Sequence, residues 1–118
     1  MKDEFLSQVN DYLVQQDFVK ENDSYIKKGY VQSNQQVVIN GQVIKSPPVE
    51  VKLIVELLGT GIVMNEDETQ TDFELINFTI KQNSEIVGEI NYSYYYNFDE
   101  FTNIFNNFFN RWISYKNI

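Results

Sequence analysis

Hydrophobic periodicity changes twice along this chain, and the order of the changes leaves few folds open. Residues 2–16 repeat apolar side chains at the three- and four-residue spacing of an amphipathic helix, and residues 98–112 do the same. The segments between them alternate apolar and polar side chains, as half-buried strands do. We therefore predict one helix at each end of the chain, with strands between them.

The first helix is expected to run from about residue 2 to about residue 16. Asp3 and Glu4 near its start suit the positive end of the helix dipole. Because its apolar residues recur on one face, this helix should pack against the strands. That stripe consists of Phe5, Val9, Tyr12, Leu13 and Gln16, with Leu6 at its edge.

The last helix is marked by a capping box and by its aromatic content. Asn97 is a suitable N-cap and Glu100 follows three residues later, so the helix should begin directly after Asn97. If Phe98, Phe109 or Ile113 lies off the main stripe, the surplus apolar surface would suit a second copy, so a homodimer stays open beside simple core burial. The stripe itself consists of Phe101, Ile104, Phe105, Phe108, Phe109 and Trp112.

Two glycine-containing signals divide the strands. Asn40-Gly41 lies between two short apolar segments and predicts a tight hairpin, because both turn residues tolerate positive φ. Gly59-Thr60-Gly61 predicts a bend or bulge after the alternating strand that begins at Val49. The strand 72–81 changes its apolar phase, which indicates a bulge or burial on both faces.

The predicted order is therefore a helix, five or six strands and a second helix. Short turns join the strands, so the sheet should be mainly antiparallel, with both helices packed on one face. We predict a single two-layer α+β domain over residues 1–118, and its uncovered sheet face would be available to a partner.

The types of side chain present restrict the chemistry that this chain can perform. The chain has no histidine, no cysteine and one arginine, Arg111. It therefore lacks the usual general base near neutral pH, the most reactive nucleophile and most zinc ligands. Nothing in the sequence selects a catalytic pair among the 17 carboxylates. We expect a protein that is not an enzyme and that binds no metal and no cofactor.

Charge and hydropathy suggest a compartment and a kind of partner. The net charge of −8 argues against nucleic acid, whose phosphates attract basic surfaces. No apolar run approaches the roughly 20 residues that cross a bilayer, and the first residues are acidic where a signal peptide is basic. We expect a cytoplasmic protein without a membrane partner, acting in the host cytoplasm if a phage encodes it.

One group of carboxylates stands out between the strands. Its spacing does not match a calcium-binding loop. Two interpretations stay open in addition to a minor metal-binding one: a solvated loop, or an acidic contact for a basic protein partner. The candidate partner-binding acids are Glu66, Asp67, Glu68, Asp72 and Glu74.

Three alternating tyrosines form the second candidate site. Tyr92, Tyr94 and Tyr96 share one face of the most regular predicted strand. Their rings could fill the core against the helices, anchor a protein interface or stack nucleic-acid bases.

These features lead to three functional hypotheses. The first is a non-catalytic, acidic protein-binding module, a small bacterial or phage inhibitor or accessory factor that binds a basic protein. The alternatives are a single-stranded nucleic-acid binder that uses the sheet tyrosines, and a structural subunit of a phage or other assembly.

Overall fold

A computed structural model describes residues 2–31, 36–45 and 48–114. Within these ranges the chain forms two helices and seven strands. In chain order the elements are α1 (Lys2–Gln15), β1 (Val19–Glu21), β2 (Ser24–Val31), β3 (Gln36–Ile39), β4 (Gln42–Lys45), β5 (Val49–Met64), β6 (Gln70–Gln82), β7 (Glu85–Tyr94) and α2 (Phe98–Ser114).

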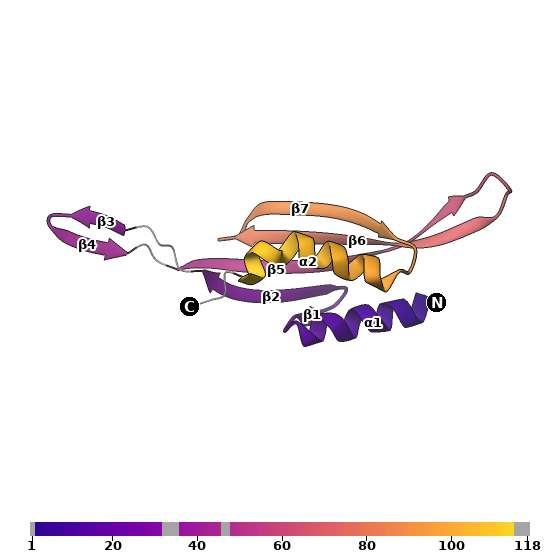
Figure 1. Cartoon of the computed structure of the whole chain (residues 1–118), viewed down its shortest axis with the longest axis horizontal. Coiled ribbons are helices and arrows are strands. Elements are labelled where there is room, and N and C mark those ends of the chain that lie inside the picture. The colour runs from indigo at the N-terminus through magenta and orange to yellow at the C-terminus, as the bar shows by residue number, and fades with distance from the viewer. Residues whose placement is uncertain (1, 32–35, 46–47, 115–118) are drawn as a thin grey trace.

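Five strands form one antiparallel sheet in the order β1-β2-β5-β6-β7, and β3 pairs with β4 in a separate hairpin. The predicted α+β class is confirmed, with a helix at each end of an antiparallel sheet. The sheet has five strands because β2 pairs directly with β5, from Val31 opposite Val49 to Ser24 opposite Glu56. The β3–β4 segment between those two strands therefore projects from the sheet as a hairpin (Figure 1).

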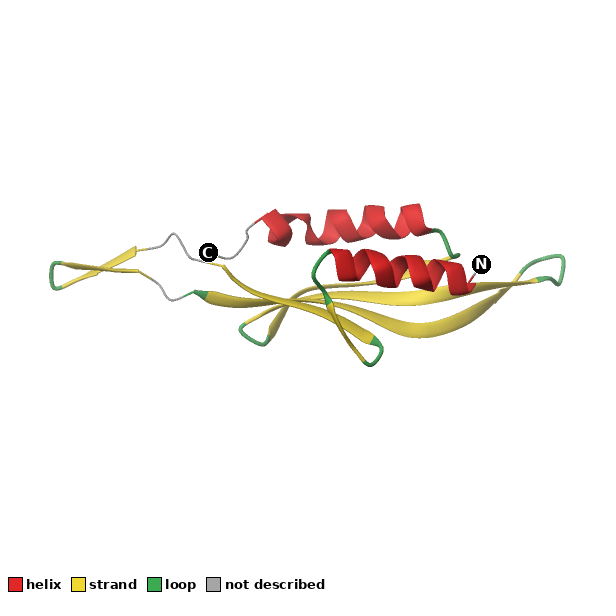
Figure 2. Ribbon diagram, turned by 90° about the horizontal axis from the view of Figure 1, so that it is seen from below, coloured by secondary structure: helices red, strands yellow, loops and turns green. Residues whose placement is uncertain are grey.

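Both helices lie on the same face of the sheet, which leaves the other face uncovered by helix (Figure 2). The predicted stripe of α1 is confirmed at Phe5, Val9 and Leu13, which are buried. The two helices also touch each other, because Tyr12 Oη donates a hydrogen bond to Asn106 Oδ1 at 3.1 Å. The result is a two-layer arrangement of helices on a sheet.

The core between the layers is largely aromatic. Phe101 lies at its centre, with its ring centroid 6.4 Å from that of Phe5, 5.8 Å from Phe78 and 5.7 Å from Tyr94. Because these rings meet edge-on or tilted, each gains contact energy beyond its buried area. The helix-facing strand residues of the core are Tyr25, Val51, Leu53, Val55, Ile76, Phe78, Ile80 and Tyr94.

The α2 stripe is buried at Phe101, Phe105 and Phe109, while Ile104 and Phe108 are partly buried. Phe109 therefore belongs to the core. Phe98 is partly buried as well, because its ring packs against those of Tyr12 and Phe101. The side chains of Trp112 and Ile113 lie outside the described part of the structure.

The local signals are also confirmed. Asn97 Oδ1 accepts a hydrogen bond from the Glu100 amide at 3.1 Å, so Asn97 caps α2. Asn40 and Gly41 have φ of 53° and 80°, which fits the tight hairpin turn. A register shift between Leu57 and Gly59 places the predicted bulge within β5, and the strand continues beyond it.

The change of apolar phase in β6 reflects burial on both faces. Residues 76–80 are all buried, with Ile76, Phe78 and Ile80 toward the helices and Asn77 and Thr79 on the other face. A second register shift occurs only near the end of the strand, between Ile80 and Lys81.

Two hairpin arms make the molecule long. Its principal extents are 73 × 27 × 23 Å and its radius of gyration is 18.5 Å, against roughly 13 Å for a compact domain of this length. The β3–β4 hairpin extends from one end (Figure 1). At the other end β5 and β6 continue past β2 and β7 as a two-stranded arm, residues 61–73, which we call the β5–β6 arm.

Candidate functional site

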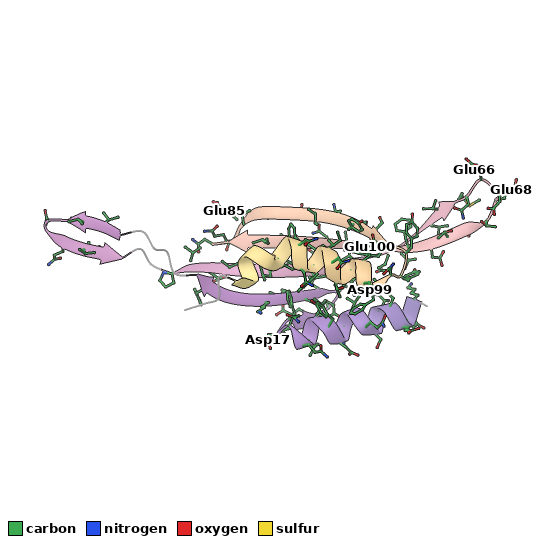
Figure 3. The ribbon with its side chains drawn as sticks, in the orientation of Figure 1. Asp17, Glu66, Glu68, Glu85, Asp99 and Glu100 are labelled. Carbon is green, nitrogen blue, oxygen red and sulfur yellow. The ribbon has the colours of Figure 1, made fainter. Side chains whose placement is uncertain are left out.

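The acidic residues predicted to contact a partner lie along the β5–β6 arm. Glu66, Asp67 and Glu68 are exposed in the turn at its tip, and Figure 3 shows Glu66 and Glu68 at the far end of the molecule. Asp72 is exposed further back on β6, whereas Glu74 is buried at the base of the arm. The structure therefore gathers three of the five acids at one exposed tip.

The conformation of the tip follows from short polar side chains that bond to one another. Asn65 Nδ2 donates to Thr69 Oγ1 at 3.0 Å and to Thr71 Oγ1 at 2.8 Å, which closes the turn. Asp67 Oδ1 accepts from the Thr69 amide at 3.1 Å, and also from its hydroxyl. These hydrogen bonds hold the pKa of Asp67 below its usual value. The carboxylates are thus held on a closed turn.

Glu74 does not belong to this exposed surface, which corrects the sequence-based expectation. Strand alternation places it on the face of Ile76 and the helices, and only 3% of it is exposed. Its Oε2 accepts a hydrogen bond from Thr60 Oγ1 at 3.1 Å, and its cross-strand partner is Tyr94. Glu74 therefore lies buried at the base of the arm and offers no surface to a partner.

Of the three candidate tyrosines, Tyr92 and Tyr94 lie on the helix-covered face of β7. Tyr96 lies beyond the end of the strand in a bend with φ of 57°, which corrects the expectation that all three share one strand face. Tyr94 is fully buried, with its ring 4.8 Å from that of Tyr92 and 5.7 Å from that of Phe101. Burial raises the pKa of the Tyr94 hydroxyl, and a hydrogen bond to Glu100 raises that of Tyr92. Tyr96 is partly buried and packs against the core. Of the three interpretations, core packing against the helices is the one that describes the placement of these tyrosines.

The β3–β4 hairpin is a candidate surface that the sequence reasoning did not single out. It carries five large apolar side chains, and each is between 46% and 66% exposed. Val37 pairs with Ile44 and Val38 with Val43, so consecutive pairs place apolar groups on both faces. A signal was present in the sequence, since residues 36–44 contain no charge. The five residues are Val37, Val38, Ile39, Val43 and Ile44.

The sheet face opposite the helices, which we call the open face, is polar at its centre. Asn77 and Thr79 are both buried there, although no helix covers them. Asn77 Nδ2 donates to Thr79 Oγ1 at 2.9 Å, and Thr79 Oγ1 donates to Glu89 Oε2 at 3.3 Å. These hydrogen bonds join polar side chains of β6 and β7 at the centre of the open face.

No family model, curated protein or solved structure matches this chain. Neither helix in the described part of the chain is both long and apolar enough to cross a membrane. Among residues 2–31, 36–45 and 48–114, no three acidic side chains converge as metal ligands would.

Proposed function

We propose that this chain is a non-catalytic protein-binding module that engages its partner through the β3–β4 hairpin. The observation that carries the proposal is the exposure of five large apolar side chains on a hairpin that projects from the sheet. An isolated two-stranded hairpin is at best marginally stable in water. Exposed apolar clusters of this kind mark interaction surfaces, so a partner that covers the hairpin would stabilise it.

The acidic tip of the β5–β6 arm supplies the second part of the mechanism. Glu66, Asp67 and Glu68 are exposed together on a chain of net charge −8, so they attract a basic surface. Apolar contacts provide affinity, whereas complementary charges mainly raise the association rate and fix the orientation. The module acts in this proposal as a small bacterial or phage inhibitor or accessory factor in the cytoplasm, or in the host cytoplasm if phage-encoded.

The placement of the sheet tyrosines does not favour nucleic-acid binding as a second function. Base stacking needs accessible ring faces, and Tyr94 has none.

The test is capture of the partner from the source organism, followed by affinity measurement with matched variants. Val38→Lys with Val43→Lys should weaken binding roughly a hundredfold, because charge replaces two anchors on one hairpin face. Val14→Lys is the control, since Val14 is a comparably exposed valine on α1. Unchanged affinity of the hairpin variant would exclude the hairpin from the mechanism.

The contribution of the tip is measured separately on the same complex. Replacing Glu66, Asp67 and Glu68 with Gln, Asn and Gln should lower the association rate and flatten its salt dependence. If the rate and its salt dependence both stay the same, the tip takes no part in recognition.

A further inference from the structure

Three lysines stand side by side across the open face. Lys28 on β2 is directly opposite Lys52 on β5, and Lys52 is directly opposite Lys81 on β6. Directly opposed side chains in an antiparallel pair have their Cβ atoms only about 5 Å apart. Lys52 lies between the core residues Val51 and Leu53, so it points away from the helices. We call these three residues the lysine row.

The lysine row is unusual in a chain of this composition. Only nine lysines and arginines oppose 17 carboxylates, yet three of the nine are direct neighbours. Like charges directly opposite each other destabilise a sheet, and this arrangement contains two such pairs in succession. An anionic group placed over the row would remove that repulsion.

The surroundings of the row leave most of its charge uncompensated within the described residues. Lys52 Nζ lies 3.8 Å from Glu50 Oε1, a long ion pair between side chains that are 32% and 38% exposed. No ion pair of Lys28 or Lys81 occurs in the described part of the chain. No helix covers this face (Figure 2), so a partner can approach the row directly.

The complementary group is present on the same chain. The tip of the β5–β6 arm presents Glu66, Asp67 and Glu68 on a turn that is narrow and closed by hydrogen bonds. Three lysines on adjacent strands span two inter-strand spacings, about 10 Å, which matches the width of a two-stranded tip with its side chains. The lysine row and the acidic tip thus agree in the number of charges that they carry and in their width.

We propose that the lysine row is the docking surface for the acidic tip of a second copy of this chain. The inference rests on the proposed function in one respect, since it names the basic surface that the tip recognises. A tip cannot reach the row of its own molecule. Lys52 and Met64, at the base of the turn, are twelve positions apart on β5, which is about 40 Å of extended strand.

Docking of this kind is head-to-tail, because two different surfaces meet. Such a contact leaves one free tip and one free row at the ends of every dimer, so it propagates into a ring or a filament. The pairing depends on exposed charges, and it therefore weakens as the ionic strength rises. The assembly subunit considered from the sequence alone gains a physical basis here.

The test uses charge reversal in two variants of the full chain, K28E/K52E/K81E and E66K/D67K/E68K. Sedimentation velocity at low ionic strength should show concentration-dependent association of the wild type, reversed by added salt. Each variant alone should associate roughly tenfold or more weakly, because its tip and its row then carry the same sign. An equimolar mixture should associate again, since the tip of each variant is complementary to the row of the other.

The matched control is K2E/K20E/K27E, which changes the net charge equally without touching the row. This control should associate more strongly than K28E/K52E/K81E, because its lysine row is intact. Circular dichroism establishes that all variants are folded. A wild type that stays monomeric, or a mixture that does not associate, overturns the proposal. The proposal is also overturned if a labelled single-stranded oligonucleotide binds the lysine row of the wild type and the wild type does not self-associate.

These results are distinguishable from failure of the proposed function. Capture of a different protein by the β3–β4 hairpin is measured with Val38→Lys and Val43→Lys, which leave the tip and the row unchanged. If the mixture test fails while that capture persists, only the second-copy docking is lost.

Discussion

The two hairpin arms of this protein are held in place by different means. The β3–β4 hairpin has only its own four-pair ladder and carries apolar side chains on both faces. The β5–β6 arm continues two strands of the central sheet and ends in an acidic turn. One arm is short, uncharged between residues 36 and 44 and separate from the core, whereas the other is an extension of the core strands.

The difference shows how an arm can be made rigid without a core of its own. Gly61 has no side chain, and the ring of its cross-strand partner Phe73 occupies the space where a Cβ would be. The same ring meets Tyr95 edge-on, with 6.1 Å between centroids. An aromatic ring over a cross-strand glycine is a known device for stabilising strands. The β3–β4 hairpin has no comparable support among the described residues, so its order depends on what covers it.

The largest expected effect comes from removing the centre of the core. Phe101→Ala should lower the free energy of unfolding by about 3–5 kcal/mol, because a buried ring is replaced by a cavity. Amide exchange should then accelerate throughout β5 and β6, including their arm, and stay unchanged in β3 and β4. Denaturant titration and hydrogen exchange measure the two effects. Slower or equal exchange in the β5–β6 arm would show that this arm is independent of the core.

An intermediate effect is expected from filling the space above Gly61. Gly61→Val should cost about 1–3 kcal/mol, since the ring of Phe73 must move away and lose its contact with Tyr95. Chemical denaturation gives the loss, and the amides of residues 59–64 should show it most strongly.

Gly41→Val is the matched variant in the other arm. Gly41 has φ of 80°, a value that strains any β-branched residue, so the β3–β4 turn should open. The free energy of unfolding of the whole protein should nevertheless change by no more than about 0.5 kcal/mol, because this hairpin contributes nothing to the core. A loss as large as that of Gly61→Val would remove the distinction between the arms.

The smallest effect is a response to pH at the acidic tip. Hydrogen bonds from Thr69 lower the pKa of Asp67 below its usual value of 3.8. The stabilisation from these hydrogen bonds to the Asp67 carboxylate is therefore complete above pH 3.8. It is lost as the pH falls through the lowered pKa of Asp67 in the folded state. An NMR titration of the Thr69 amide should give a midpoint below 3.8, and Asp67→Asn should remove the transition. The β3–β4 amides should not respond, since residues 36–44 contain no titratable side chain.

Local elements were predictable where the sequence carries a strong short-range signal. Asn97 with Glu100 marks the start of α2, Asn40-Gly41 marks the hairpin, and the spacing of Phe5, Val9 and Leu13 marks the buried face of α1. Each signal acts within a few residues of chain, so no knowledge of the tertiary structure is needed.

The candidate site was predictable only in part. The acidic tip residues Glu66, Asp67 and Glu68 are exposed as the loop pattern suggests. Glu74 is different, because whether a strand residue faces water depends on which elements cover that face. Tyr94 illustrates the same point, since alternation groups the tyrosines on one side but does not say that the helices lie there.

The sequence by itself determined the order of the elements, the antiparallel sheet and the aromatic faces of the helices, because periodicity and turn chemistry are local properties. Only the tertiary structure decided that β2 pairs directly with β5 and in which register β5 pairs with β6. The first pairing excludes the apolar β3–β4 hairpin from the sheet and aligns Lys28 with Lys52. The second extends the acidic arm beyond the opposite end and aligns Lys52 with Lys81. Residues more than twenty positions apart become neighbours only through strand register, and register is set by the packing of the whole sheet.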